Sequence, residues 1–394
     1  MLVTGLIRLL VSLAIIFFLQ PASADAQAPP APCNLQVNGV SSPDTTCLSP
    51  LALLTGPVTP LSSPASAYDT LQLTKGRIYA DGFPQFPGDI LASNFYDFAL
   101  ALYEVYYRTG DPYWRDKARV VAAAQRDYQG NQNLNAYLAG NYKLGTISPR
   151  DMSTLGMAIS VVEAGDSATP GLRSTRQIVN DQARLGAAYF GTFRYCGPTP
   201  ATTCRNDVRE PAYALIAMLA ATILGDDHRA DAKKSLDSFL AGQEPGGNWL
   251  MQQLDLVPAG PLTLNYMNGL AMEALILYDR VIGDPRIVPA IERCMNFMWT
   301  TQWVPAAQAF QYASLTSGSV NTNPYPNLNG LLLPAWGYAY AKTRNPAYKD
   351  QGDQILSGLI QPGADRSYGI YEVKQYGQMF RSSPRYFGYI NEMP

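Results

Sequence analysis

Five segments of the chain are apolar on almost every side, and each ends in a tight turn. The segments begin near residues 98, 155, 212, 269 and 330. Glycine suits the left-handed residue that closes a helix, Asp or Asn caps the next helix, and proline fits its first turn. The pattern therefore predicts five buried helices, each followed at once by a second helix. The turns are Gly110-Asp111, Gly165-Asp166, Gly225-Asp226, Gly283-Asp284 and Asn345-Pro346.

The helix after each turn is amphipathic and charged, as in residues 113–124 and 229–240. A helix that is apolar all round must be surrounded by protein, whereas an amphipathic helix lies outside it. The pair recurs about every 60 residues, which leaves about 20 residues for a long connector before the next pair. We therefore expect an all-α fold, an α/α toroid with an inner ring, an outer ring and the long connectors on one face. Connectors of this length argue against the rival architecture, a right-handed α-solenoid.

One stretch carries a resemblance to known proteins. Asn94-Phe-Tyr-Asp-Phe-Ala-Leu-Ala-Leu-Tyr103, followed by Tyr107-Arg-Thr-Gly-Asp-Pro112, resembles the first inner helix and turn of the six-hairpin glycosidases and polysaccharide lyases. The resemblance covers about residues 68–394, concerns architecture and points to no specific family. It implies an (α/α)6 toroid that acts on carbohydrate, with residues 68–394 as a single catalytic domain. Because five hairpins are visible, the sixth comes from residues 68–93, comes from the C-terminal tail, or is absent.

The N-terminal segment is typical of an export signal. Arg8 precedes an apolar run from Leu9 to Leu19, and small residues follow that allow cleavage after Ala24 or Ala26. The run is too short for a comfortable membrane span, although an uncleaved anchor is the alternative. We expect residues 1–24 to be a signal peptide and residues 25–67 to be a Pro/Ser-rich segment. The mature protein is then secreted or periplasmic and has no membrane partner.

Four of the five cysteines fall in two polar loops. Cys33 and Cys47 flank one loop, and Cys196 and Cys204 flank the other. Pairs of this kind form disulfides in the oxidising compartments that exported proteins reach. A metal site is a poorer interpretation, because neither spacing is Cys-x-x-Cys and no histidine is near. We expect two disulfides, no metal, and a buried apolar role for the remaining Cys294.

Composition narrows the chemistry. With 47% hydrophobic and 15% charged residues, the chain has ample material for a large core. The formal net charge is −2 and no basic stripe occurs, so nucleic acid is not an expected partner. A single histidine, His228, lies in a tight turn, where it is solvated or caps a helix, so a zinc site or a Ser-His-Asp triad built on histidine is excluded. The sequence contains no G-x-G-x-x-G loop, P-loop, H-E-x-x-H or G-x-S-x-G motif. We expect a monomer without cofactors.

Polar residues gather where the inner helices are expected to begin, and ring closure would bring them to one mouth. Aromatic rings in the connectors would stack on sugars, and the C-terminal run, which has no helical pattern, would lie beside the mouth. The alternatives are that the carboxylates only cap helices and that the aromatics only pack loops. The polar residues at helix starts are Asp97, Asp151, Asp207, Arg209, Glu210, Asn265, Tyr266, Asn268, Asn327 and Asn329. The aromatics are Tyr142, Trp249, Trp303, Tyr312 and Tyr325, and the residues of the C-terminal run are Glu372 and Arg381.

Three functions follow from this set. A glycoside hydrolase needs a protonated carboxylic acid and a second carboxylate; Glu210 is our expected acid, Asp97 or Asp151 the base, and Asp207 a further candidate. A polysaccharide lyase acting on a uronic acid polymer would instead use Tyr266 with Asn265, Asn268 and Arg209. An exported glycan-binding or envelope protein would use the same mouth without chemistry. The near absence of histidine favours the hydrolase, with a polysaccharide or oligosaccharide as substrate.

Overall fold

The computed structural model describes residues 48–83, 96–131, 154–192, 208–250, 262–315, 322–361 and 372–392. The chain divides into residues Met1–Ser49 and residues Pro50–Pro394, and the fold below is that of the second unit. Several predictions lie outside the described residues. They are the signal peptide, the cysteines Cys33, Cys47, Cys196 and Cys204, and the candidate residues Tyr142, Asp151 and Asp207.

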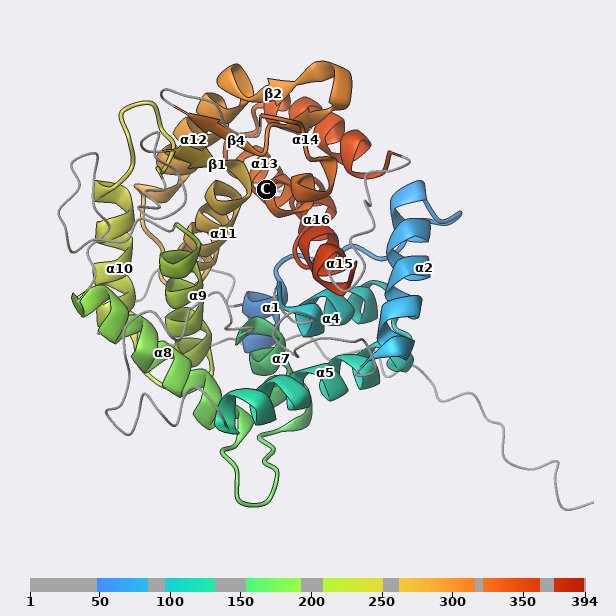
Figure 1. Cartoon of the computed structure of the whole chain (residues 1–394), viewed down its shortest axis with the longest axis vertical. Helices are drawn as coiled ribbons and strands as arrows, with labels where there is room; N and C mark the ends of the chain where they lie inside the picture. The colour runs from blue at the N-terminus through green and yellow to red at the C-terminus, as the bar shows by residue number, and fades with distance from the viewer. Residues whose placement is uncertain are drawn as a thin grey trace, which may run out of the picture. The chain divides into compact units, whose positions relative to one another are not determined.

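A closed ring of helices forms the inside of this unit (Figure 1). Each inner helix contacts the next, and the last contacts the first, so the predicted α/α toroid is confirmed. The inner helices are almost wholly buried, as their all-round apolar sequences require. In ring order they are α4 (Phe98–Thr109), α7 (Thr154–Ala164), α9 (Arg209–Ile223), α11 (Asn265–Val281), α13 (Asn329–Thr343) and the C-terminal pair α15 (Glu372–Phe380) and α16 (Arg385–Asn391).

A second set of helices covers the ring. Each of five outer helices follows an inner helix and packs against it. Four follow through a tight turn as predicted, whereas residues 165–174 separate α7 from α8, so the second helix does not follow at once there. Four of the five connections contain a glycine with positive φ, such as Gly110 at 69° and Gly283 at 84°, as the sequence predicts. The five are α5 (Pro112–Asn131), α8 (Thr175–Thr192), α10 (Arg229–Ala241), α12 (Ile287–Thr301) and α14 (Pro346–Leu359).

The sixth pair is assembled from both ends of the unit. Helix α2 (Ala67–Gly82) contacts α4 and α15 on the outside, while α15 and α16 fill the inner position. A capping box of Ser66 and Asp69 starts α2, and Asp69 also forms a buried ion pair with Arg108 of α4. Both sources considered for the sixth hairpin therefore contribute to it, one outside and one inside.

The C-terminal run corrects one prediction, because it is helical. Helices α15 and α16 are separated by a short break at residues 381–384 and are buried against α4 and α13. Gly388 allows α16 to approach closely, since a Cβ there would lie 2.3 Å from the carbonyl oxygen of Pro57. The apolar residues Val373, Tyr376 and Phe380 of α15 do recur at helical spacing, so this signal was present in the sequence and was missed.

Short elements occupy the connectors and one end of the ring. Strand β1 (Leu262–Leu264) pairs antiparallel with β4 (Ala313–Leu315), and β2 (Trp303–Val304) pairs with β3 (Ala309–Phe310). The 3-10 helices η2 (Pro305–Ala307) and η3 (Pro326–Leu328) complete these connectors. Helix α1 (Pro50–Thr55) contacts α7, α9 and α11 near the tight turns, where Arg280 donates to the carbonyl of Ala52 at 3.0 Å. The helix thus closes the end of the ring that lacks the connectors.

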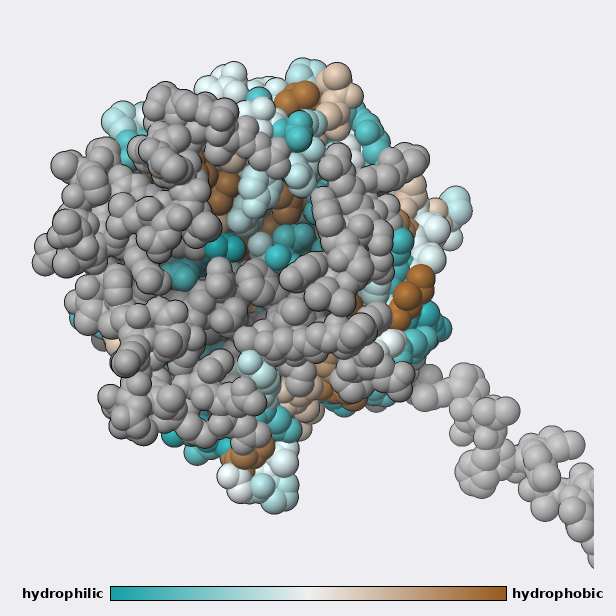
Figure 2. Space-filling model, viewed as in Figure 1, coloured by the Kyte–Doolittle hydropathy of each residue, from teal (hydrophilic) through white to brown (hydrophobic). Residues whose placement is uncertain are grey.

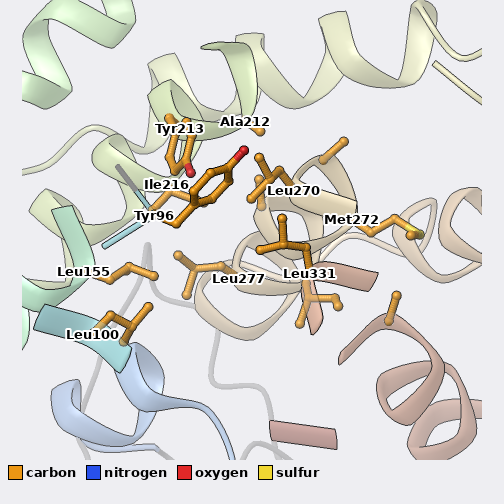
Figure 3. Close-up of a cluster of buried hydrophobic side chains, with 14 of the residues drawn as sticks. Tyr96, Leu100, Leu155, Ala212, Tyr213, Ile216, Leu270, Met272, Leu277 and Leu331 are labelled. Atoms are coloured by element: carbon orange, nitrogen blue, oxygen red, sulfur yellow. The ribbon is translucent and has the colours of Figure 1, made fainter. Parts of the chain in front are cut away.

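The interior of the ring is apolar in its middle layers. Figure 3 shows Leu100, Leu155, Ile216 and Leu277 from different inner helices meeting in one buried cluster.

Across the described ranges, no helix has the length and apolarity that crossing a membrane requires.

Candidate functional site

The inner helices begin at one end of the ring, which we call the mouth. The polar residues predicted from the helix starts are Asp97 before α4, Glu210 in α9, Asn265 in α11 and Asn329 in α13, and the structure places them at these starts. Figure 2 shows hydrophilic residues in a hollow near the centre of the face that it presents. The mouth is therefore a polar end of the ring.

Asp97 joins two inner helices at the mouth. Its Oδ1 accepts a hydrogen bond from the backbone N–H of Leu100, and its Oδ2 accepts one from that of Gly156, both at 3.1 Å. Burial raises the pKa of this carboxyl, while the charge of Arg381 and the backbone donors lower it. The side chain is only 2% exposed. This geometry is that of a helix cap, the alternative noted from the sequence, rather than of a base open to substrate.

Glu210 stands in the first turn of α9 and is 8% exposed. Its neighbour Arg209 is half-buried, with its guanidinium carbon 5.9 Å from the centre of the Tyr266 ring. Among the mouth residues that the structure describes, Glu210 and Asp97 are the carboxylates, and Asp97 serves as a cap. Glu210 is therefore the second described carboxylate at the start of an inner helix.

Tyrosines line the mouth on the side of α9 and α11. Figure 3 shows Tyr96 and Tyr213 beside each other over the apolar cluster. The ring centroids of Tyr266 and Tyr312 are 5.5 Å apart, and those of Tyr312 and Tyr325 are 5.0 Å apart. We call Tyr266, Tyr312 and Tyr325 the tyrosine row. Burial raises the pKa of Tyr266 well above its usual value, although the positive charge of Arg209 opposes the shift.

The asparagines of the mouth divide into two groups. Asn265 donates to the carbonyl of Gln311, and its Oδ1 is buried without a hydrogen-bond partner. Asn327 is 5% exposed beside the tyrosine row residue Tyr325. Asn268 instead accepts from the N–H of Trp249 at 2.8 Å and donates to the carbonyls of Trp249 and Leu264. Asn268 therefore fixes a connector to α11, which corrects its prediction as a substrate ligand.

Trp249 also differs from its prediction. Its side chain is fully buried, its indole N–H donates to the carbonyl of Phe239 at 2.8 Å, and its ring packs edge-on against the Phe239 ring. A ring in this position cannot stack on a sugar. Trp249 belongs to the core, because the connector that carries it folds back against α10 and α11.

Arg381 lies below the mouth rather than in it. The break between α15 and α16 turns its side chain into the ring, where it donates to the Tyr213 hydroxyl at 3.0 Å and to Glu273 at 3.2 Å. It is 1% exposed. Arg381 therefore supports the floor of the mouth, and its prediction as a direct ligand is corrected. The side chain of Glu372, the first residue of α15, lies outside the part that the structure describes.

A buried ionic network continues downward from Arg381. Glu273 also lies 3.5 Å from Arg385, which donates to Glu104 at 3.0 Å and to the carbonyl of Leu54 in α1 at 3.2 Å. Burial raises the pKa of Glu104 to about 7, although Arg385 opposes the shift. Sequence reasoning missed this network. A signal was present, because Glu104 and Glu273 are charged residues in the middle of inner helices, each flanked on both sides by apolar residues.

The other end of the ring offers little chemistry. His228 precedes α10 without capping it, and its Nε2 lies 2.8 Å from Asn180 Oδ1. Burial lowers the pKa of His228. Within the described ranges, no group of three His, Cys, Asp or Glu side chains is arranged to hold a metal ion.

Compared by sequence, the chain matches no protein-family model and no curated protein. By structure it is similar to the unsaturated glucuronyl hydrolase of Bacillus sp. GL1, at 12% identity over 74% of this chain and 84% of that one, with a TM-score of 0.53. It is similar to the Lin0763 protein of Listeria innocua, at 10% identity over 79% of this chain and 96% of that one, with a TM-score of 0.50. These likenesses confirm the resemblance in fold to the α/α-toroid glycosidases.

A more partial likeness is to a family 76 glycoside hydrolase from a bovine Bacteroides thetaiotaomicron strain. The identity is 14% and the TM-score is 0.33, over 39% of this chain and 34% of that one. The match spans only about a third of that protein and does not bear on the site.

Proposed function

We propose that this chain is a glycoside hydrolase that cleaves an oligosaccharide or polysaccharide at the mouth of the toroid. The observation that carries the proposal is the position of Glu210 at the start of an inner helix, next in sequence to Arg209, whose guanidinium carbon lies 5.9 Å from the centre of the Tyr266 ring. Aromatic rings bind the apolar faces of sugars, and a buried carboxyl group suits proton transfer. The glycosidase-like fold supports carbohydrate as the substrate class by analogy.

Glu210 would act as the general acid that protonates the leaving oxygen of the glycosidic bond. Hydrolysis then requires a second carboxylate as base or nucleophile, and the separation of the two groups decides between inversion and retention. Because Asp97 is committed to two backbone donors, we assign the second role to Asp151 or Asp207. Asp207 stands three positions before Glu210 in the chain, and Asp151 stands three positions before the start of α7.

The remaining residues of the mouth would hold the sugar. The tyrosine row presents rings tilted against one another, and Asn265 has a buried oxygen without a donor among the described residues. Asn327 and Arg209 supply further polar groups at the same end. Arg381 and Tyr213 act as the floor that fixes these side chains.

The lyase alternative receives less support from the same residues. A tyrosine that removes a proton works best when its pKa lies near the working pH, but burial moves the pKa of Tyr266 the other way. Asn268, which the lyase would also use, is committed to the backbone of Trp249 and Leu264. A glycan-binding protein without catalysis would use the same mouth and would give no product.

The proposal includes export of a monomer after removal of residues 1–24, with two disulfides, Cys33–Cys47 and Cys196–Cys204, and no nucleic acid partner. N-terminal sequencing of the exported protein tests the cleavage, because it should begin at Asp25 or Gln27.

The experiment incubates the purified chain with soluble starch, xylan, alginate and polygalacturonate and measures new reducing ends. The hydrolase predicts product from at least one polymer without the ultraviolet absorbance of an unsaturated uronate. Glu210→Gln should abolish this activity, whereas Glu163→Gln should not. Glu163 is a matched control because it lies near the opposite end of an inner helix and bonds to Tyr107. Binding without any product would overturn the hydrolase.

A further inference from the structure

Two tryptophans lie stacked beyond the mouth, at the end of outer helix α12. The rings of Trp299 and Trp303 have centroids 4.5 Å apart and planes 18° apart. Both side chains are half-buried, so each keeps part of its surface in contact with solvent. We call these two residues the tryptophan pair.

The tryptophan pair is held in a fixed orientation from behind. Phe310 packs edge-on against Trp303 with ring centroids 5.0 Å apart, and against Trp299 at 6.3 Å. Phe310 is itself buried and rests on Trp336 of α13. The pairing of β2 with β3 places Trp303 opposite Phe310 in the register. The pair is therefore a rigid aromatic surface whose ordering costs little when a ligand binds.

The same β structure links the tryptophan pair to the mouth. From Phe310 the chain reaches Tyr312 of the tyrosine row in two residues, about 7 Å along an extended strand. Tyr325 of that row donates its backbone N–H to the carbonyl of Phe310 at 3.1 Å. The tyrosine row and the tryptophan pair are thus joined through the backbone of one short β structure around the buried Phe310.

The surroundings of the tryptophan pair fit a sugar better than a protein partner. Asn296 and Thr300, on the same helix as Trp299, are exposed. The Thr300 hydroxyl donates to the carbonyl of Asn296 at 2.8 Å and keeps its oxygen as an acceptor, while the Asn296 amide also bonds to Tyr348. The exposed large aliphatic side chains among the described residues, such as Ile78 and Val120, lie on other elements. Flat aromatic rings flanked by neutral hydrogen-bonding groups suit the apolar face and the hydroxyl edge of a pyranose.

We propose that the tryptophan pair is a second glycan-binding site that holds a distal part of the chain whose glycosidic bond lies at the mouth. This inference rests on the proposed function and deepens it, because a site at the rim is useful only if the substrate is a polymer. The tyrosine row and the tryptophan pair then bind two parts of one continuous polysaccharide.

The test compares the cleavage of a polymer with the cleavage of a trisaccharide of the same sugar. The polymer is the one of soluble starch, xylan, alginate and polygalacturonate that the unmodified protein cleaves. Trp299→Ala and Trp303→Ala should each lower kcat/KM on the polymer by about 3- to 10-fold and leave the trisaccharide unchanged. They should also reduce retardation of the protein in gels that contain the polymer. Tyr340→Ala is the matched control, because Tyr340 is a half-buried aromatic at the closed end of the ring.

The comparison remains valid if a variant is partly unfolded, because loss of folded protein lowers both rates equally. An equal loss on polymer and trisaccharide, or no loss on either, would overturn the second site while leaving the hydrolase intact. Absence of cleavage and of retardation by all four polymers in the unmodified protein would overturn both proposals together.

Discussion

The Oδ2 atom of Asp97 accepts a hydrogen bond from the backbone N–H of Gly156 at 3.1 Å, and this contact joins the starts of α4 and α7. Asp97 adopts a left-handed backbone conformation, with φ at 55°, to make it. Gly156 permits the approach, because a Cβ there would lie 2.6 Å from Asp97 Oδ1. The first two inner helices are thus fixed to each other at the mouth by one carboxylate.

Replacement of Asp97 tests this structural role. Asp97→Asn keeps one acceptor oxygen but turns the other into an N–H₂ donor, which faces a backbone N–H. We expect the free energy of unfolding to fall by about 1 to 3 kcal/mol, because a buried donor loses its partner. Urea unfolding measures the change. Asp111→Asn, at an exposed turn, is the control and should change stability less, and an Asp97→Asn protein as stable as the unmodified one would contradict the cap.

The pKa of Glu104 predicts a pH dependence of stability. Burial raises this pKa from 4.5 to about 7 despite Arg385, with Arg108 and Glu273 as the other charged neighbours. Between these values the folded protein binds more protons than the unfolded chain, so this group's contribution is complete below pH 4.5 and is lost as the pH rises through 7. As the pH rises from 4.5 to about 7, the melting temperature of Glu104→Gln should therefore fall less than that of the unmodified protein. Identical slopes for both proteins would show that Glu104 does not titrate there.

Glu273 is expected to be important for stability, because it faces two buried arginines. Its Oε1 lies 3.2 Å from Arg381 and 3.5 Å from Arg385, and all three side chains are buried. Glu273→Gln removes the carboxylate paired with Arg381 and leaves Arg385 with Glu104 alone, so it should lower the free energy of unfolding by about 3 kcal/mol. Denaturant titration gives the value. Lys233→Ala, which breaks an exposed ion pair with Asp237, should have little effect, and equal effects of the two variants would refute the network.

Tyr266 distinguishes the two enzymatic mechanisms. If it only stacks on the sugar, Tyr266→Phe keeps the ring and should reduce the cleavage rate by less than about 10-fold. If Tyr266 instead transfers a proton, Tyr266→Phe should reduce the cleavage rate by about 10²- to 10⁴-fold. Initial rates of product formation separate these outcomes, and Tyr312→Phe serves as the control within the tyrosine row. A loss in the larger range would favour the lyase.

The fold could be predicted from sequence wherever an apolar helix ends in a Gly-Asp or Asn-Pro turn. The sixth position could not, because α2 and α15 come from opposite ends of the unit and no such turn joins them. Neither local propensity nor periodicity reveals that α16 is buried against Pro57 and α13. Tertiary contacts between distant segments decide these elements.

The mouth was predicted from the helix starts, but the roles of individual residues were less accessible. Trp249, Asn268 and Arg381 all stand in polar or connector sequence, yet each is buried by contacts with distant parts of the chain. Side-chain direction depends on these contacts and not on residue type. Conversely, Glu104 and Glu273 lie in mid-helix between apolar neighbours, and this signal was available in the sequence although it was missed.

The central claim is that Glu210 protonates a glycosidic oxygen at the mouth. The direct test measures the rate at which Glu210→Gln forms reducing ends. The substrate is whichever of the four polymers the unmodified chain cleaves, and Glu163→Gln and the unmodified chain are measured in the same assay. The account predicts that Glu210→Gln loses about 10²- to 10⁴-fold in rate, keeps its affinity for the polymer, and that Glu163→Gln is unchanged. A Glu210→Gln protein that cleaves at the rate of the unmodified chain would contradict it.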